Sequence, residues 1–174
     1  MIAIEKGIET LSYHKSSHMR NFAFLPVFLL FLSCNNQSNK PNGDTNSVKN
    51  EIKSTIDNYY NDIRKEGMLA GLKYMDSSSQ FFWVPPGYLN YTGYDSIAAA
   101  IRRNAASFKS ISNRYDSLLI IPLTDRYANF VMRTISTTVN AAGDTSRDAF
   151  IESGVMVKRD GAWKFLSGQT SVLE

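Results

Sequence analysis

Three long stretches near the C-terminus favour β-strands and are separated by short turn sequences. They cover residues 126–140, 145–158 and 162–172, and AAGD and RDGA stand between them. Glycine beside an aspartate or alanine in such a short connection is typical of a hairpin. This feature constrains the fold most, because strands joined by such short turns pair antiparallel with their neighbours in sequence. A further strand is expected just before them, over residues 115–123.

The first half of the folded region has a helical pattern instead. Apolar residues recur there every three or four positions from Val48 onward, with lysine, aspartate and arginine between them, and the stripe contains Val48, Ile52, Ile56, Tyr59 or Tyr60, and Ile63. This spacing predicts an amphipathic helix that ends near Gly67. A short second helix is expected over residues 69–75.

Two further elements are predicted before the strands. The sequence QFFWVPP reads as a short strand that its two prolines end. Asp95 is expected to cap a helix whose inward residues are Ile97, Ala98, Ile101, Ala105 and Phe108. Helices first and antiparallel strands later is the order of an α+β domain.

A short apolar segment near the N-terminus predicts where the protein is located. It runs for eleven residues, from Phe22 to Leu32, whereas a helix that crosses a bilayer needs about 20. A run of this length after an arginine and before a polar tract is typical of a secretory signal peptide. Phe31-Leu32-Ser33-Cys34 resembles the bacterial lipobox, in which the cysteine is lipidated, although phenylalanine stands where leucine is usual. A helix of the folded core is the alternative interpretation, and Pro26 argues against it.

These observations divide the chain into three parts. Residues 1–33 are expected to be the signal peptide, with Met19 as the true start. Residues 34–47 are expected to be the lipidated cysteine and a polar, flexible tether, and residues 48–174 to form one domain. The protein would then be lipid-anchored in the bacterial cell envelope, outside the inner membrane.

Removal of the signal peptide would limit the chemistry of the mature chain. Both histidines, His14 and His18, lie before Cys34, which is the only cysteine. A chain without histidine or free thiol cannot carry out Ser-His or Cys-His catalysis or bind zinc through those side chains. The sequence also offers no residues that point to another metal or to a cofactor, so none is predicted. The 16 basic and 14 acidic residues that remain leave a net charge of about +2, which does not favour nucleic acid as a partner.

The domain also resembles a known superfamily. The helix ending near Gly67, the sequence FFWVPPGYLNYTGYDSI and the ending VMVKRDGAWKFLSGQTS together resemble the nuclear transport factor 2-like superfamily, which includes SnoaL-like domains. The resemblance implies a curved antiparallel sheet wrapped around N-terminal helices, a cone-shaped, cystatin-like α+β barrel with a pocket. The superfamily contains isomerases, dehydratases, cyclases and pocket proteins without known catalysis, so the fold alone does not define the function. Members of the superfamily often pair through the outer face of the sheet, so the resemblance also leaves open a homodimer of this kind.

Register arithmetic gives a first set of candidate pocket residues. If Ala141 to Asp144 form a four-residue loop, Arg133 lies opposite Glu152, and a two-residue turn at Asp160-Gly161 then places Glu152 opposite Gln169. Trp163 and Phe165 would share that face, and Tyr60, Tyr74, Phe81 and Trp83 could line the same cavity. The alternative interpretations are a solvated cross-strand ion pair and ordinary core aromatics.

Three functions remain open at this stage. The first is a tethered module that binds a small, mostly apolar molecule, with Arg133 and Gln169 orienting its polar group. The second is a proton-transfer enzyme of lyase or isomerase type, with Glu152 or Asp76 as the base and Tyr60 or Tyr74 as the hydrogen-bond donor. The third is a structural or dimerising lipoprotein. Binding is favoured over catalysis, because an arginine opposite Glu152 would lower its pKa and weaken it as a base.

Overall fold

The computed structural model describes residues 44–173, and the predicted signal peptide, Cys34 and most of the tether lie outside these residues. Helix α1 (Thr45–Glu66) is followed by the 3-10 helix η1 (Met68–Tyr74), strand β1 (Phe82–Val84), helix α2 (Tyr94–Asn104) and the 3-10 turn η2 (Ala105–Ser107). Four long strands complete the domain: β2 (Phe108–Pro122), β3 (Tyr127–Asn140), β4 (Thr145–Arg159) and β5 (Ala162–Leu173). The predicted α+β class is confirmed.

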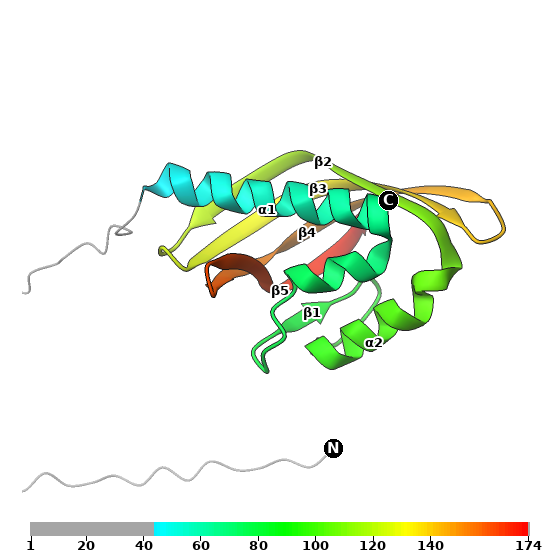
Figure 1. Cartoon of the computed structure of the whole chain (residues 1–174), viewed down its shortest axis with the longest axis horizontal. Coiled ribbons are helices and arrows are strands. Elements are labelled where there is room, and N and C mark those ends of the chain that lie inside the picture. The colour runs from blue at the N-terminus through cyan, green and yellow to red at the C-terminus, as the bar shows by residue number, and fades with distance from the viewer. Residues whose placement is uncertain (1–43, 174) are drawn as a thin grey trace, which may run out of the picture. The chain divides into compact units, whose positions relative to one another are not determined.

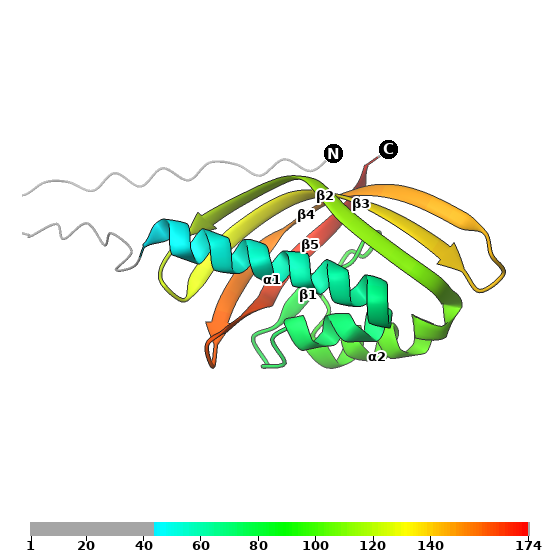
Figure 2. The same cartoon turned by 45° about the horizontal axis from the view of Figure 1, so that its top comes forward.

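The five strands form one sheet in the order β1-β5-β4-β3-β2. All neighbours pair antiparallel except β1, which runs parallel to β5. The sheet is curved and does not close, and α1 lies against its concave side (Figures 1 and 2). Among residues 44–173, no helix is both long and apolar enough to cross a bilayer.

The apolar stripe of α1 forms one half of the core. The buried residues of the helix are Val48, Ile52, Ile56, Tyr60 and Ile63, as the helical spacing predicts. Four of them pack against the inner side chains of the long strands, namely Ile120, Ala128, Phe130, Met132, Met156, Trp163 and Phe165. Burial of this stripe, rather than helix propensity alone, holds α1 in place.

Helix α2 begins differently from the prediction. Its N-cap is Gly93, which makes no side-chain capping bond, and Asp95 lies inside the first turn. An acidic residue there still stabilises the helix through the helix dipole. The helix also ends before Phe108, which instead begins β2.

The β3–β4 hairpin differs from the predicted register by one residue. Val139 pairs with Thr145, so the loop has five residues rather than four. The cause is the side chain of Asn140, whose Oδ1 accepts bonds from the backbone N–H groups of Gly143 and Asp144 at 2.8 and 2.9 Å. Asn140 therefore takes part in the turn toward β4, although it still pairs with Phe108 of β2 as the last residue of β3. Because side chains alternate between faces, this shift moves every residue of β3 to the face opposite the predicted one.

The β4–β5 hairpin begins with the predicted turn and then shifts. Arg159 pairs with Ala162, which confirms the two-residue turn at Asp160-Gly161. Further along, β5 contains one extra residue, Leu166, between the partners of Met156 and Val155. This bulge brings Thr170, not Gln169, opposite Glu152.

Candidate functional site

Glu152 lies on the concave side of the sheet, next to α1. Its neighbours across the strands are Met132 on β3 and Thr170 on β5. The row that faces the helices is therefore Met132, Glu152 and Thr170, a carboxyl group between a thioether and a hydroxyl. The row expected from sequence, Arg133, Glu152 and Gln169, is wrong in two of its three members.

Uncharged hydroxyl groups surround the carboxyl group of Glu152. Its Oε2 accepts from the Thr134 hydroxyl at 2.8 Å and from the Tyr60 phenol at 3.0 Å. The Tyr60 and Thr134 oxygens are themselves 2.9 Å apart. The Thr170 hydroxyl lies 3.5 Å from Oε1, at the outer limit of a hydrogen bond. One carboxyl oxygen is thus well bonded, whereas the other has only a weak protein partner.

The environment of Glu152 favours its protonated form. Burial raises its pKa above the ordinary value of 4.5, and the hydrogen bonds from Thr134, Tyr60 and Thr170 oppose this rise in part. The ion pairs among residues 44–173 involve other carboxylates, so no cation of this region compensates a charge on Glu152. Burial also raises the pKa of the Tyr60 phenol, and an ionised Glu152 would raise it further, so Tyr60 stays neutral.

Glu152 and Thr170 line a cavity of about 370 Å³ whose other walls are mainly apolar. The walls come from α1, η1, β1, α2 and the long strands, and the residues are Tyr59, Met68, Met75, Trp83, Pro85, Pro86, Ile97, Ile101, Met132 and Phe165. Glu152 keeps some accessible surface because it faces this space, while protein atoms still desolvate its carboxyl group. An apolar cavity with a few polar groups on one wall is the usual form of a small-molecule site.

Trp83 forms a wall of the cavity through a close packing contact. Its indole N–H donates to the Thr170 hydroxyl at 3.0 Å. A Cβ atom at Gly168 would lie 2.7 Å from the Trp83 ring, so glycine at this position lets the indole pack directly on β5. Trp83 thereby links β1 to the residue that stands beside Glu152.

The model of the SnoaL-like domain family matches residues 52–174. The chain belongs to the SnoaL-like domain family. No curated protein sequence gives a significant match.

Solved structures support the fold of this SnoaL-like domain. A nuclear transport factor 2-like superfamily protein from Salmonella enterica serovar Typhimurium is 20% identical, covers 75% of this chain and 94% of its own, and has a TM-score of 0.64. A protein with a cystatin-like fold from Caulobacter vibrioides is 17% identical, with 74% and 91% covered and a TM-score of 0.58. A hexachlorocyclohexane dehydrochlorinase is 10% identical, with 74% and 86% covered and a TM-score of 0.59. At identities this low, the TM-scores of these structures show a shared fold and nothing more specific.

Two residues expected in the pocket of the SnoaL-like domain lie elsewhere. Arg133 is on the outer face of the sheet, where it forms an ion pair with Asp116 of β2. Gln169 is exposed and pairs with Ser153 on β4. Both corrections follow from the longer β3–β4 loop and the bulge at Leu166. The physical ground for regarding Glu152 as a weak base, an arginine opposite it, is therefore absent.

Three more candidates also lie outside the apolar cavity of this SnoaL-like domain. The Asp76 carboxylate is buried and bonded to Ser78 and, at 3.2 Å, to Arg159, which fits a structural role. The Tyr74 phenol donates to Asp62. Trp163 is only 3% exposed and its indole donates to Glu51 at 2.9 Å. Of the residues predicted from sequence, Glu152, Phe165 and Trp83 do line the apolar cavity, and Tyr60 contacts Glu152.

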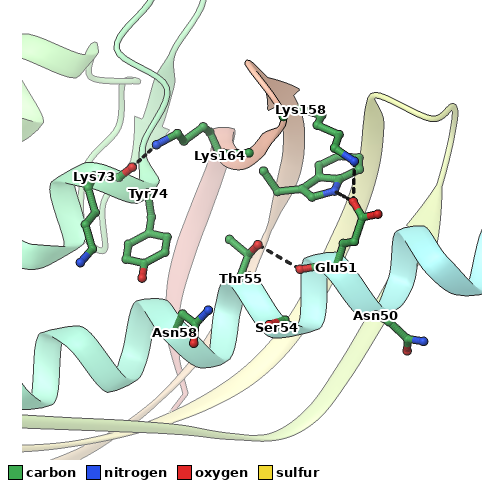
Figure 3. Close-up of a pocket in the computed structure, with 12 residues that line it drawn as sticks. Asn50, Glu51, Ser54, Thr55, Asn58, Lys73, Tyr74, Lys158 and Lys164 are labelled. Atoms are coloured by element: carbon green, nitrogen blue, oxygen red, sulfur yellow. Dashed lines mark hydrogen bonds and ion pairs between the residues drawn. The ribbon is translucent and has the colours of Figure 1, made fainter.

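Trp163 and Tyr74 instead border a larger polar cleft of about 780 Å³ between α1, η1 and the β4–β5 turn. Figure 3 shows Lys158 directed at Glu51, with 2.6 Å between Nζ and Oε2, and Lys164 directed at the Lys73 carbonyl. Lys73 itself pairs with Asp62 at 2.8 Å. Two of the three lysines are thus paired with carboxylates, which weakens the attraction of the cleft for an anion. We therefore regard the cavity around Glu152 as the better candidate site of the SnoaL-like domain. Residues 44–173 also contain no group of three or more metal-ligating side chains.

Sequence reasoning missed Thr134, Thr170 and Met132 as neighbours of Glu152. A signal existed for the first hairpin, since asparagine side chains commonly bond the backbone N–H groups of a turn that follows them. That reading would have placed Met132 and Thr134 on the inner face. The bulge at Leu166 has no comparable signal in its own residues, so Thr170 could not be found.

Proposed function

We propose that the SnoaL-like domain binds a small, mostly apolar molecule in the 370 Å³ cavity, with Glu152 as its main polar contact. The observation that carries this proposal is a buried, uncompensated carboxyl group on an otherwise apolar wall. In its protonated form the group has a hydroxyl to donate, and Oε1 is the oxygen with the weaker protein partner. The ligand would therefore carry a hydrogen-bond acceptor such as a carbonyl oxygen.

A second candidate is proton transfer to or from the bound molecule by Glu152, as in a lyase or isomerase. The raised pKa of Glu152 favours it, because its carboxylate is then a stronger base than that of an ordinary glutamate. A hexachlorocyclohexane dehydrochlorinase with the same fold supports elimination chemistry as one form of it. Against it, the Tyr60 phenol is bonded to Glu152 and Thr134 and leaves no evident donor for a developing oxyanion.

A ligand screen with two variants tests the binding proposal. Native mass spectrometry of the chain purified from its host's extract would show a retained molecule, and a thermal-shift screen would cover steroids, polyketide-like acids and fatty acids. We expect a hit to stabilise the wild type, to lose about tenfold in affinity with Glu152→Leu, which has no hydrogen-bond donor, and to lose binding with Ile101→Trp, which fills the cavity. A compound bound equally by the wild type and Ile101→Trp would contradict the proposal. A compound that Glu152→Gln still binds but no longer converts would favour the enzyme.

The location of the protein is a separate part of the proposal. Cys34 would be lipidated and would anchor the chain in the bacterial cell envelope; the lipobox-like sequence supports this. Two or more acyl chains are what stable anchoring requires. Metabolic labelling with a fatty-acid analogue should mark the wild type and leave Cys34→Ser unmarked. Label retained in Cys34→Ser would contradict the assignment.

A further inference from the structure

Residues 84–91 form a loop that begins at the last residue of β1 and leads toward α2, and this loop exposes large apolar and aromatic side chains. Leu89 is 99% exposed, Tyr91 74% and Tyr88 62%. Phe82, at the base of the loop, is also exposed and packs edge-on against Tyr91, with 5.9 Å between ring centroids. None of these side chains contributes to the buried core, so the fold itself does not explain their presence.

The loop is held in one conformation. Trp83 and Thr92 exchange two backbone hydrogen bonds of 2.9 and 2.7 Å, which close its base. Within it, the Tyr88 N–H donates to the Pro85 carbonyl at 3.1 Å, and Gly87 has a φ of 77°, a value suited to glycine at the third position of a type II turn. The preceding prolines restrict the backbone further. The exposed side chains therefore stand on a preorganised support.

The surrounding sequence contains no charge. From Ser77 to Tyr94 there is no aspartate, glutamate, lysine or arginine, although charged residues make up 20% of the chain. Tyrosine is enriched at membrane–water interfaces, and leucine is common on the apolar face of segments that lie in that region. A charged residue in the loop would oppose such insertion.

We propose that the 84–91 loop inserts shallowly into the interfacial region of a lipid bilayer. A bilayer suits the loop better than a protein partner, because the sequence from Ser77 to Tyr94 carries no charge, whereas the rim of a protein interface is polar. Each inserted apolar side chain contributes to membrane binding by itself. Pro85 and Pro86 of the same loop line the apolar cavity, so insertion would bring that cavity close to the lipid.

A fluorophore on the loop tests this inference directly. Cys34 is the only cysteine, so the full chain with Cys34→Ser can be labelled at a single new site with a polarity-sensitive nitrobenzoxadiazole dye. One protein carries Asn90→Cys, within the loop. The matched control carries Leu119→Cys, which replaces another exposed apolar side chain, on β2. Phosphatidylcholine vesicles should shift the emission to the blue and increase it at position 90 and not at position 119.

Further substitutions measure the contribution of the loop. In the position-90 protein, Leu89→Asp should lower the partition coefficient by about tenfold, because a leucine side chain is lost from the apolar phase. Leu119→Asp should leave it unchanged. The N-terminal residues are the same in every variant, so their contribution cancels in the ratio. An equal response at positions 90 and 119, or no response at either, would overturn the inference, and so would an unchanged partition coefficient with Leu89→Asp. A cavity found to bind no ligand would contradict the proposed function but would not affect this inference.

Discussion

The Tyr60 phenol meets the Glu152 carboxyl group at 3.0 Å, across the contact between α1 and the concave side of β4. The two residues are 92 positions apart in the chain. The Thr134 hydroxyl, which is uncharged, lies within hydrogen-bond distance of both groups. The bond joins the core of the domain to the wall of its apolar cavity. A change in either group should therefore affect both stability and the state of the cavity.

The pH dependence of stability should show the cost of ionising Glu152. Its pKa is raised in the folded state, so the stabilisation is complete below the ordinary value of 4.5 and is lost as the pH rises through the folded pKa. Glu152→Gln removes this loss. We expect the free energy of unfolding of Glu152→Gln to be about 1 kcal/mol higher than that of the wild type at neutral pH. This difference should disappear in acid, where Glu152 is protonated. Urea unfolding from pH 4 to pH 8 measures the difference. If the wild type became more stable relative to Glu152→Gln as the pH rises, the prediction would be contradicted.

Removal of the Tyr60 hydroxyl should act on the same group. Tyr60→Phe deletes a hydrogen bond that favours the ionised form, so the pKa of Glu152 should rise further. The unfolding free energy should fall by about 1 to 2 kcal/mol. Tyr115→Phe is the matched control, because its ring lies 6.4 Å from that of Tyr60 but its hydroxyl donates to Asp57. Equal effects of the two substitutions on the Glu152 titration would exclude a specific role for Tyr60.

Gly168→Ala should disturb the cavity wall without touching Glu152. The new Cβ would lie 2.7 Å from the Trp83 ring and 2.6 Å from the Ser153 carbonyl oxygen. We expect a loss of about 1 to 3 kcal/mol in urea unfolding and a change in tryptophan emission. At Gly93 a Cβ meets nothing within 4 Å, so Gly93→Ala is the control and should cost less than about 1 kcal/mol. Similar losses in both variants would mean that Trp83 is not held against Gly168.

Much of the fold could be predicted because it depends on local patterns. The stripe from Val48 to Ile63 and the turn at Asp160-Gly161 are short-range signals, and both are confirmed. The site depends instead on registers that two single residues alter. Asn140 joins the first turn and Leu166 adds a bulge, and together they replace Arg133 and Gln169 by Met132 and Thr170. Each shift is one residue long, which is enough to exchange the two faces of a strand.

Trp163 should contribute strongly to the stability of the core that α1 forms with the long strands. It is 3% exposed and hydrogen-bonded to Glu51, so Trp163→Ala should lower the unfolding free energy by about 3 to 5 kcal/mol. Leu119→Ala, at a side chain 55% exposed on β2, should cost less than about 1 kcal/mol. Urea unfolding of both variants gives the comparison. A loss below about 1 kcal/mol for Trp163→Ala would contradict the burial of the indole.

The most direct test is the titration of Glu152 itself. The carboxyl carbon can be followed by ¹³C NMR as the pH is raised, and the resonance that disappears in Glu152→Gln identifies it. A buried carboxyl group without a compensating cation predicts a pKa above 4.5 in the wild type and higher still in Tyr60→Phe. A pKa at or below 4.5 would show that the carboxylate is solvated or paired with a cation, and would contradict the proposed site.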